Sequence, residues 1–179
     1  LVLAPTLSHR RCEGLLRNGL PADAVVTDVT SGWATLHVAG PRSRELLQTV
    51  TDTDLADAAF PFRAAREIAI GFARALCIRI TYVGELGYEL YIPAEMATHV
   101  YDRVVAAGEP AGLRHAGLKA LASLRMEKGY RDYGHDIDNT DDVYAVGLGF
   151  AVALDKPGGF TGRKATLAAK ERGTPHHRL

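Results

Sequence analysis

The segment from Thr81 to Pro93 holds the clearest candidates for ligand recognition in this chain. Glu85 falls inside a glycine-bounded turn, and Glu89 follows it in a run typical of a β-strand. Glycine permits tight turn geometry and the close approach of a ligand. Carboxylates beside such a turn can accept paired N–H donors from a flat heterocycle such as a pterin or purine. The segment therefore predicts a small-molecule site.

The same two carboxylates also fit ordinary solvent-exposed positions. With a turn over 84–87, Glu85 lies at its tip, and Glu89 shares one face of the returning strand with Tyr91. The alternate residues 88, 90 and 92 then share the opposite face. Because most glutamates are exposed, the local pattern alone favours solvated side chains over ligand contacts.

Arg125 interrupts the apolar side of a helix expected over 115–128. At about 100° per residue, it falls between Leu118 and Leu121 on that side. An unpaired buried charge is costly, so Arg125 needs a partner. The commoner outcome is a structural ion pair, with Glu89 as a candidate carboxylate, and the alternative is an anionic ligand in a pocket.

The loop that follows, residues 129–142, is rich in aromatic and titratable side chains. His135 beside Asp136 could perform acid–base chemistry, but neighbours in sequence need not meet in space, and a hydrogen-bonded loop histidine is favoured. The acidic run from Asp136 resembles a calcium loop. That loop needs Gly at its sixth position and Glu at its twelfth, where this chain has Asp141 and Gly147, so we reject it.

Composition indicates a globular protein of one domain or one and a half, with 179 residues. Its 21 basic and 21 acidic residues form no long run of one sign, which argues against nucleic-acid binding. Cys12 and Cys77 lack metal or redox spacing, so a reduced cytoplasmic location is the default. No apolar run approaches the ~20 residues of a membrane span. No signal peptide is visible, although Leu1 is not a natural start.

Apolar periodicity and turn residues predict an α+β fold with antiparallel sheets and helices. Expected strands cover 25–30, 33–38, 63–71, 74–83, 88–92 and 148–154, with the first two joined as a hairpin at Ser31-Gly32. Expected helices cover 8–18, a segment after Pro41, a segment after Pro93, 115–128 and 162–171. Residues 1–4 and 176–179 resemble strands without partners. We therefore expect a chain cut from something larger, whose open edges favour self-association.

Residues 81–93 and 123–137 closely resemble the tetrahydrofolate-binding aminomethyltransferase family, the T-protein of the glycine cleavage system. Within these motifs, the residues at 128–130 and 133–137 are most similar to those in the folate-binding C-terminal half of dimethylglycine and sarcosine dehydrogenases. Further motifs at 28–31, 40–43, 60–63 and 147–150 occur in the same order. The resemblance covers roughly residues 25–170 of the chain.

The resemblance implies an α+β cloverleaf-like fold with a central folate channel. Family members transfer a one-carbon unit from an aminomethyl or iminium species to tetrahydrofolate. Glu89 matches the glutamate that binds the pterin, which agrees with its hydrogen-bonding chemistry. Tyr82 and Glu85 match the turn beside the pterin, and Arg125 matches an arginine that supports the site. Tetrahydrofolate and an amine are thus the implied small-molecule partners.

The chain departs from the T-protein pattern at several places. Leu121 replaces a folate-contacting arginine, as in the dehydrogenase branch, and Ala122 replaces an aspartate. The catalytic aspartate of the family would lie upstream of Leu1, and the C-terminal barrel is also missing. We therefore expect residues 1–179 to be a partial domain with no catalytic residue and no metal of its own. A dehydrogenase-like parent would carry a preceding FAD domain, although nothing in these residues indicates flavin binding.

Two other functions fit the resemblance. One is a non-catalytic folate-binding paralogue of the type linked to iron–sulfur maintenance, but such proteins have a cysteine where this chain has Tyr130. The other is a folate-dependent demethylase that acts on a methylated sulfur or oxygen donor.

Overall fold

A computed structural model describes residues 1–173 of the chain. The chain divides into two compact units, Leu1–Leu124 and Arg125–Leu179. The expected strand at 176–179 lies outside the described residues.

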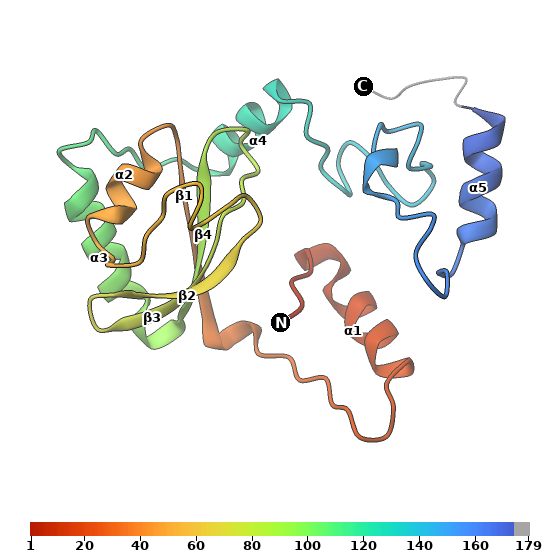
Figure 1. Ribbon diagram of the computed structural model, residues 1–179, viewed down its shortest axis with the longest axis horizontal. Coiled ribbons are helices and arrows are strands. Elements are labelled where there is room, and N and C mark those ends of the chain that lie inside the picture. The colour runs from red at the N-terminus through yellow and green to blue at the C-terminus, as the bar shows by residue number, and fades with distance from the viewer. Residues whose placement is uncertain (174–179) are drawn as a thin grey trace. The chain divides into compact units, whose positions relative to one another are not determined.

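The first unit is built on a four-stranded antiparallel sheet (Figure 1). Its strands are β1 (Trp33–Ala39), β2 (Ala65–Ile70), β3 (Ala73–Ile78) and β4 (Gly87–Pro93). They lie in the order β1-β4-β3-β2, and every pairing is antiparallel. The sheet and its helices confirm the predicted α+β class.

The partner of β1 differs from the predicted one. Trp33 lies opposite Pro93 and Ala39 opposite Gly87, so β1 pairs with β4 along its full length. Residues 25–29 form no strand, and Thr30–Gly32 form a 3₁₀ turn, η2. The predicted hairpin at Ser31-Gly32 is therefore wrong. Val25 is 86% exposed, so its segment buries too little apolar surface to join the sheet.

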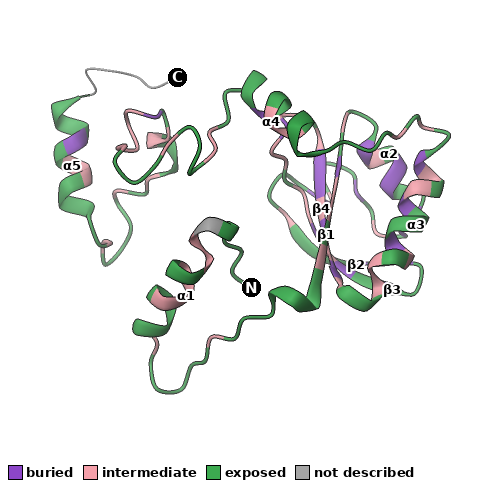
Figure 2. Cartoon of the chain, turned by 180° about the vertical axis from the view of Figure 1, so that it is seen from behind, coloured by how far each residue is buried: buried purple, intermediate pink, exposed green. Residues whose placement is uncertain are grey.

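The core lies between the sheet and two helices, α2 (Ser43–Gln48) and α3 (Ala97–Gly108). A short 3₁₀ helix, η3 (Ala94–Met96), leads from β4 into α3. Figure 2 shows buried residues on β4 and on both helices. Fully buried side chains from these elements include Leu47, Tyr88, Leu90, Ile92 and Val100. The alternation along β4 confirms that residues 88, 90 and 92 share the buried face.

Helix α1 (His9–Asn18) follows a 3₁₀ turn, η1 (Thr6–Ser8), and ends at Gly19 as predicted. None of its residues is buried. The strand expected at residues 1–4 is wrong, because the segment has no regular structure and Leu1, Val2 and Leu3 are exposed. An open strand edge at 1–4 therefore gives no support to self-association, which stays a prediction.

Helix α4 (Leu118–Glu127) spans the boundary between the units, and the second unit continues with η4 (Gly149–Ala151) and α5 (Arg163–Arg172). The strand predicted over 148–154 is wrong. Gly147 adopts a left-handed φ of 69°, and the 3₁₀ turn after it leaves Phe150 87% exposed. A turn at Gly147 and an outward Phe150 are incompatible with a buried strand.

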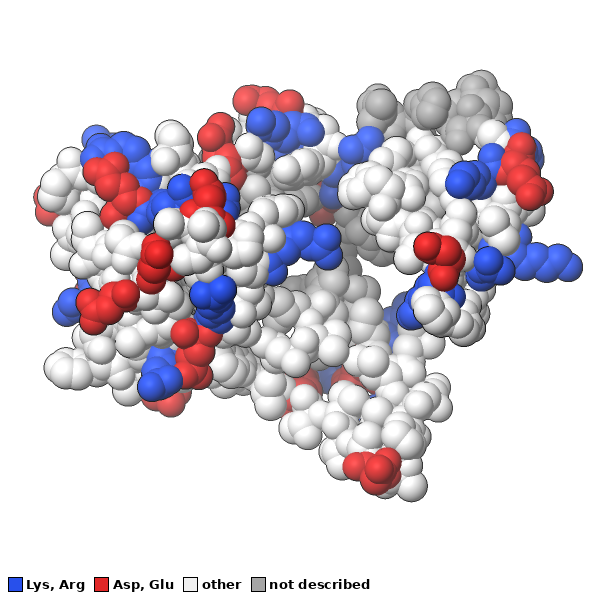
Figure 3. All heavy atoms as spheres, viewed as in Figure 1, with Lys and Arg blue, Asp and Glu red and all other residues white. Residues whose placement is uncertain are grey.

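Charged side chains of both signs are interspersed on the face drawn in Figure 3. The whole chain carries equal numbers of basic and acidic residues. Among residues 1–173, no helix has both the length and the apolar character needed to cross a bilayer.

Candidate functional site

The sheet has a second face, opposite the core, which we call the open face. It carries Thr35 and His37 from β1, Glu89 and Tyr91 from β4, and Leu76 and Ile78 from β3. In the strand register His37 and Ile78 flank Glu89, and Thr35 and Leu76 flank Tyr91. Most of these side chains are half-buried. The open face therefore places the carboxylate of Glu89 among aromatic, aliphatic and imidazole groups.

Glu89 is the acidic group at the centre of the open face. The local pattern favoured a solvated side chain, yet Glu89 is half-buried and accepts a 2.5 Å hydrogen bond at Oε2 from the Tyr91 hydroxyl. Burial raises the pKa of Tyr91, and the hydrogen bond to Glu89 raises it further. Tyr91 therefore stays protonated and acts as a donor near neutral pH. The predicted shared face of Glu89 and Tyr91 is confirmed.

His37 was not among the site residues predicted from the sequence. Its Nε2 is buried and has no hydrogen-bond partner among the described residues. Burial lowers the pKa of His37, while the negative charge of Glu89 partly opposes that shift. The ring is therefore uncharged near neutral pH. The available signal was the alternation of polar Thr35 and His37 in β1, but their position beside Glu89 depends on the long-range β1–β4 register.

The connection from β3 to β4 holds the other two residues predicted beside the pterin. Tyr82 is half-buried, and Glu85 is exposed, as its local pattern indicated. Gly84 has a φ of 76°, which favours glycine and agrees with the predicted turn. The Leu86 carbonyl accepts the Gly40 N–H at 2.8 Å. This hydrogen bond ties the connection to the segment after β1.

Gly87 allows the imidazole of His37 to lie close to the start of β4. A Cβ at residue 87 would stand 3.0 Å from His37 Nε2 and 3.1 Å from the carbonyl oxygen of Ile80. Both contacts are tighter than ordinary van der Waals spacing. The glycine before Tyr88 thus has a packing reason as well as a turn role.

A cavity of about 870 Å³ adjoins this region within the first unit. Its lining includes His37, Glu85, Tyr101 and His115, together with apolar residues of α2 and α3. The hydroxyl of Tyr101 and Nε2 of His115 are 2.8 Å apart. The volume lies in the range of small-molecule sites, whose linings combine apolar surface with a few polar groups.

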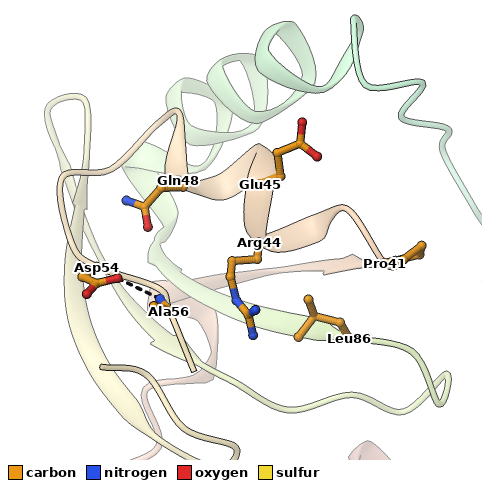
Figure 4. A pocket seen from close by; sticks show the side chains of 7 residues that line it. All are labelled: Pro41, Arg44, Glu45, Gln48, Asp54, Ala56 and Leu86. Carbon is orange, nitrogen blue, oxygen red and sulfur yellow. Dashed lines mark hydrogen bonds between the residues drawn. The ribbon is translucent and has the colours of Figure 1, made fainter. Parts of the chain in front are cut away.

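A smaller cavity of about 350 Å³ lies beside α2 (Figure 4). Its polar lining is already used within the protein. Gln48 donates from Nε2 to the carbonyls of Thr51 and Thr53, and Asp54 accepts the N–H of Ala56 at 2.8 Å. Arg44 donates to the Tyr88 hydroxyl at 3.1 Å. These contacts stabilise the loop after α2. Because the polar groups already bond within the protein, this cavity is a poorer candidate for a ligand site than the open face.

Arg125 belongs to the second unit and is 3% exposed. Its guanidinium pairs with Asp136 and donates to the Tyr130 carbonyl at 2.9 Å. The predicted structural ion pair of Arg125 is confirmed, but its carboxylate is Asp136 and not Glu89, the candidate predicted from the sequence. The Arg125 hydrogen bond holds the pKa of Asp136 far below its usual range, with help from the Asp132 N–H and His135.

His135 has a largely exposed side chain whose Nδ1 lies 3.1 Å from Asp136 Oδ1. It is thus a hydrogen-bonded loop histidine, as the sequence favoured. Its contact with Asp136 joins it to the pair made by Arg125. This arrangement is structural, since every charged group in it already has a partner.

One group of possible metal ligands occurs in the first unit. His9, Glu13 and Asp28 have ligand atoms within 4.8 Å of one another. Glu13, however, is paired with Arg10 and Arg17, and the Arg17 contact measures 2.8 Å. Two neighbouring guanidinium groups oppose a cation at this place.

The family of this chain is shown by comparisons with known proteins. Residues 1–156 match the family described as the GCVT N-terminal domain. The chain is 42% identical over 179 residues to 4-methylaminobutanoate oxidase (formaldehyde-forming) of Paenarthrobacter nicotinovorans. This match covers 99% of the chain and 22% of that protein. It is 35% identical over 161 residues to mitochondrial dimethylglycine dehydrogenase of Rattus norvegicus, covering 90% of the chain and 19% of that enzyme.

Human mitochondrial sarcosine dehydrogenase is 41% identical over 130 residues, which cover 73% of the chain and 14% of the enzyme. The chain thus spans about a fifth or less of the length of these relatives. It belongs to the GCVT N-terminal domain family, and it is an aminomethyltransferase-like domain of the kind found in these demethylating enzymes. The family resemblance deduced from residues 81–93 and 123–137 is confirmed.

Proposed function

We propose that this chain is the tetrahydrofolate-binding module of a one-carbon transfer enzyme. The module receives a methylene or aminomethyl unit from an amine donor and passes it to tetrahydrofolate. The observation that carries the proposal is Glu89, a half-buried carboxylate held by Tyr91 on the open face of an aminomethyltransferase-family sheet. Tetrahydrofolate supplies the amine nitrogens that take up the one-carbon unit.

The residues of the open face fit a reduced pterin. Nothing among residues 1–173 donates to Oε1 of Glu89, and each carboxylate oxygen offers more than one acceptor site. Glu89 can therefore accept the ring N–H and the exocyclic amine together. Leu76 and Ile78 offer apolar contacts beside it. Tyr82 and Glu85 complete the proposed contacts from the β3–β4 connection. Arg125 belongs to the second unit, where it is paired with Asp136, and its predicted support of the folate site stays a prediction.

The amine donor in this proposal is an N-methylated amino acid. The names of the three relatives specify 4-methylaminobutanoate, dimethylglycine and sarcosine, which share an N-methyl group and a carboxylate. A whole enzyme of this kind would use FAD, in a region other than these residues, to oxidise the N-methyl group. A cytoplasmic location stays a prediction, since two of the relatives are mitochondrial by name.

Calorimetric titration with tetrahydrofolate, kept reduced, tests the proposal. Loss of a charge-assisted hydrogen-bond pair costs about 1.5–3 kcal/mol, so Glu89→Ala should weaken binding by about 10- to 150-fold. Glu67→Ala is the matched control, because Glu67 is an exposed carboxylate on β2 that is engaged by Arg74. Equal affinity in the wild type and Glu89→Ala would refute the site, and a wild-type protein without measurable binding would refute the function.

A further inference from the structure

The Tyr91–Glu89 hydrogen bond has a geometry suited to orienting a recognition group. The two residues lie two apart on β4, so their side chains leave the same face of the sheet. The hydroxyl reaches Oε2 at 2.5 Å and makes no use of Oε1. Tyr91 thus occupies one acceptor position of the carboxylate and leaves the others available.

The neighbours of Glu89 across the strands do not compete for it as cations. His37 on β1 is opposite Glu89, and Ile78 on β3 is opposite it on the other side. Burial lowers the pKa of His37, so its ring carries no charge near neutral pH. Among residues 1–173, no ion pair includes Glu89, although arginines elsewhere in the first unit are paired with carboxylates.

We propose that Tyr91 is a positioning residue for the folate site, whose hydroxyl fixes the carboxylate plane of Glu89 before the ligand arrives. This inference rests on the proposed function. A free glutamate side chain has several rotatable bonds, and their freedom is lost when it binds a flat ligand in one orientation. A hydrogen bond present beforehand reduces that loss. Tyr91 therefore raises affinity through Glu89 without contacting the ligand.

A double-mutant cycle separates this role from a general structural one. The dissociation constant for tetrahydrofolate is measured for the wild type, Tyr91→Phe, Glu89→Ala and the double variant. Tyr91→Phe removes one hydroxyl and should weaken binding about 3- to 10-fold, the range of one net hydrogen bond. In the Glu89→Ala background the same change should have no further effect.

Tyr88→Phe provides the matched control. Tyr88 lies on the same strand but on the buried face, where its hydroxyl accepts from Arg44 at 3.1 Å. Its replacement also removes one hydrogen-bonded hydroxyl from β4. Fluorescence of Trp33, the single tryptophan, reports whether each variant keeps the sheet folded. Folded Tyr88→Phe should retain wild-type affinity.

The possible results distinguish the two proposals. Weaker binding by Glu89→Ala with unchanged affinity in Tyr91→Phe overturns the positioning role and leaves the folate site standing. An equal loss from Tyr91→Phe in both backgrounds also overturns it, because Tyr91 would then contact the ligand directly. No effect of Glu89→Ala, or no binding by the wild type, overturns the proposed site and the inference together. If Tyr91→Phe weakens binding only when Glu89 is intact, and not in the Glu89→Ala background, the result supports both the folate site and the positioning role.

Discussion

His37 and Glu89 lie directly opposite each other in the antiparallel pair of β1 and β4, on the face of the sheet that the core helices leave uncovered. An imidazole beside a carboxylate would ordinarily gain a proton more readily. Here burial has the larger effect and lowers the pKa of His37 in spite of Glu89. The imidazole ring that faces Glu89 is therefore neutral at neutral pH.

The first prediction concerns the pH dependence of stability. An unfolded histidine has a pKa of about 6.5. Because the folded pKa of His37 is lower, the unfolded chain binds the proton more readily. The stability associated with a neutral His37 should be complete above about pH 6.5 and fall as the pH drops below it. The ring is partly solvated, so the loss should be at most about 1 kcal/mol.

Urea unfolding followed by Trp33 fluorescence at pH 7.5 and 5.5 measures this effect. His37→Gln removes the titrating group and should lose less stability between these pH values than the wild type. His135→Gln is the matched control, because its side chain is 78% exposed and lies in the second unit. If the wild type and His37→Gln show the same change with pH, the burial of a neutral His37 does not matter to folding.

The second prediction concerns the ion pair of Arg125 and Asp136. Arg125 is 3% exposed at its side chain, whereas Asp136 is 30% exposed. Asp136→Asn leaves a buried cation without its carboxylate, but Arg125→Met leaves an anion that water can reach. Asp136→Asn should therefore destabilise the second unit more than Arg125→Met, toward the lower end of the roughly 3–5 kcal/mol expected for an uncompensated buried charge.

Hydrogen exchange of the amides in residues 130–147 measures the stability of this loop. In Asp136→Asn, the Asp132 N–H should lose its protection from exchange first, because it donates to the Asp136 carboxylate at 2.9 Å in the wild type. Because the folded pKa of Asp136 is lowered, its contribution should be present above about pH 4 and be lost as the pH falls further. Greater damage from Arg125→Met than from Asp136→Asn would contradict this account of the pair.

The third prediction concerns thiol reactivity. Cys77 is fully buried in β3, and burial raises its pKa to about 12. Since the thiolate is the reactive form, iodoacetamide at pH 8 should leave Cys77 unmodified in the folded protein. Cys12 in α1 is partly exposed and provides an internal comparison. Mass spectrometry should find label on Cys12 first, and on Cys77 only after urea unfolds the sheet.

Rapid labelling of both cysteines under native conditions would show that β3 opens readily. Cys77→Ser keeps the size of the side chain and removes the reactive group. Its peptide should stay unlabelled even in urea, which verifies that the signal in the wild type comes from Cys77.

Local patterns correctly predicted which side chains are buried within a single strand or helix. The alternation in β4 correctly separated Glu89 and Tyr91 from the buried residues 88, 90 and 92. Helix α3 also followed from its apolar repeat, with Val100 and Val104 buried. In both elements the periodicity reports directly which side chains leave the solvent.

The predictions from sequence failed where strand pairing or a side-chain contact depended on residues distant in the chain. Residues 25–30 looked like a strand, but β1 pairs with β4 and leaves Val25 exposed. The position of His37 beside Glu89 depends on that same register. Asp136 could not be chosen as the partner of Arg125 from helix periodicity, because it is brought back by the loop at 129–136. Side-chain pairing across a loop leaves no periodic signal in the chain.

The fourth prediction tests the packing of the core with two glycines in helices. Gly108 is buried at the end of α3, and a Cβ there would stand 2.5 Å from Cδ1 of Leu113 and 2.8 Å from Cδ1 of Leu46. The added methyl group therefore overfills the contact between α3 and α2. Gly108→Ala should lower the free energy of unfolding by about 1–3 kcal/mol. Urea unfolding followed by Trp33 fluorescence measures the change.

Gly14→Ala is the matched control, because Gly14 lies inside α1 and a Cβ there meets nothing within 4 Å. Alanine is favoured over glycine in a helix interior by about 0.5–1 kcal/mol, so this substitution should increase the protection of α1 amides from hydrogen exchange. The same chemical change then has opposite effects for a physical reason, close packing at one site and open space at the other. A neutral or stabilising Gly108→Ala would mean that Leu113 moves aside and that the contact of α3 with α2 is loosely packed.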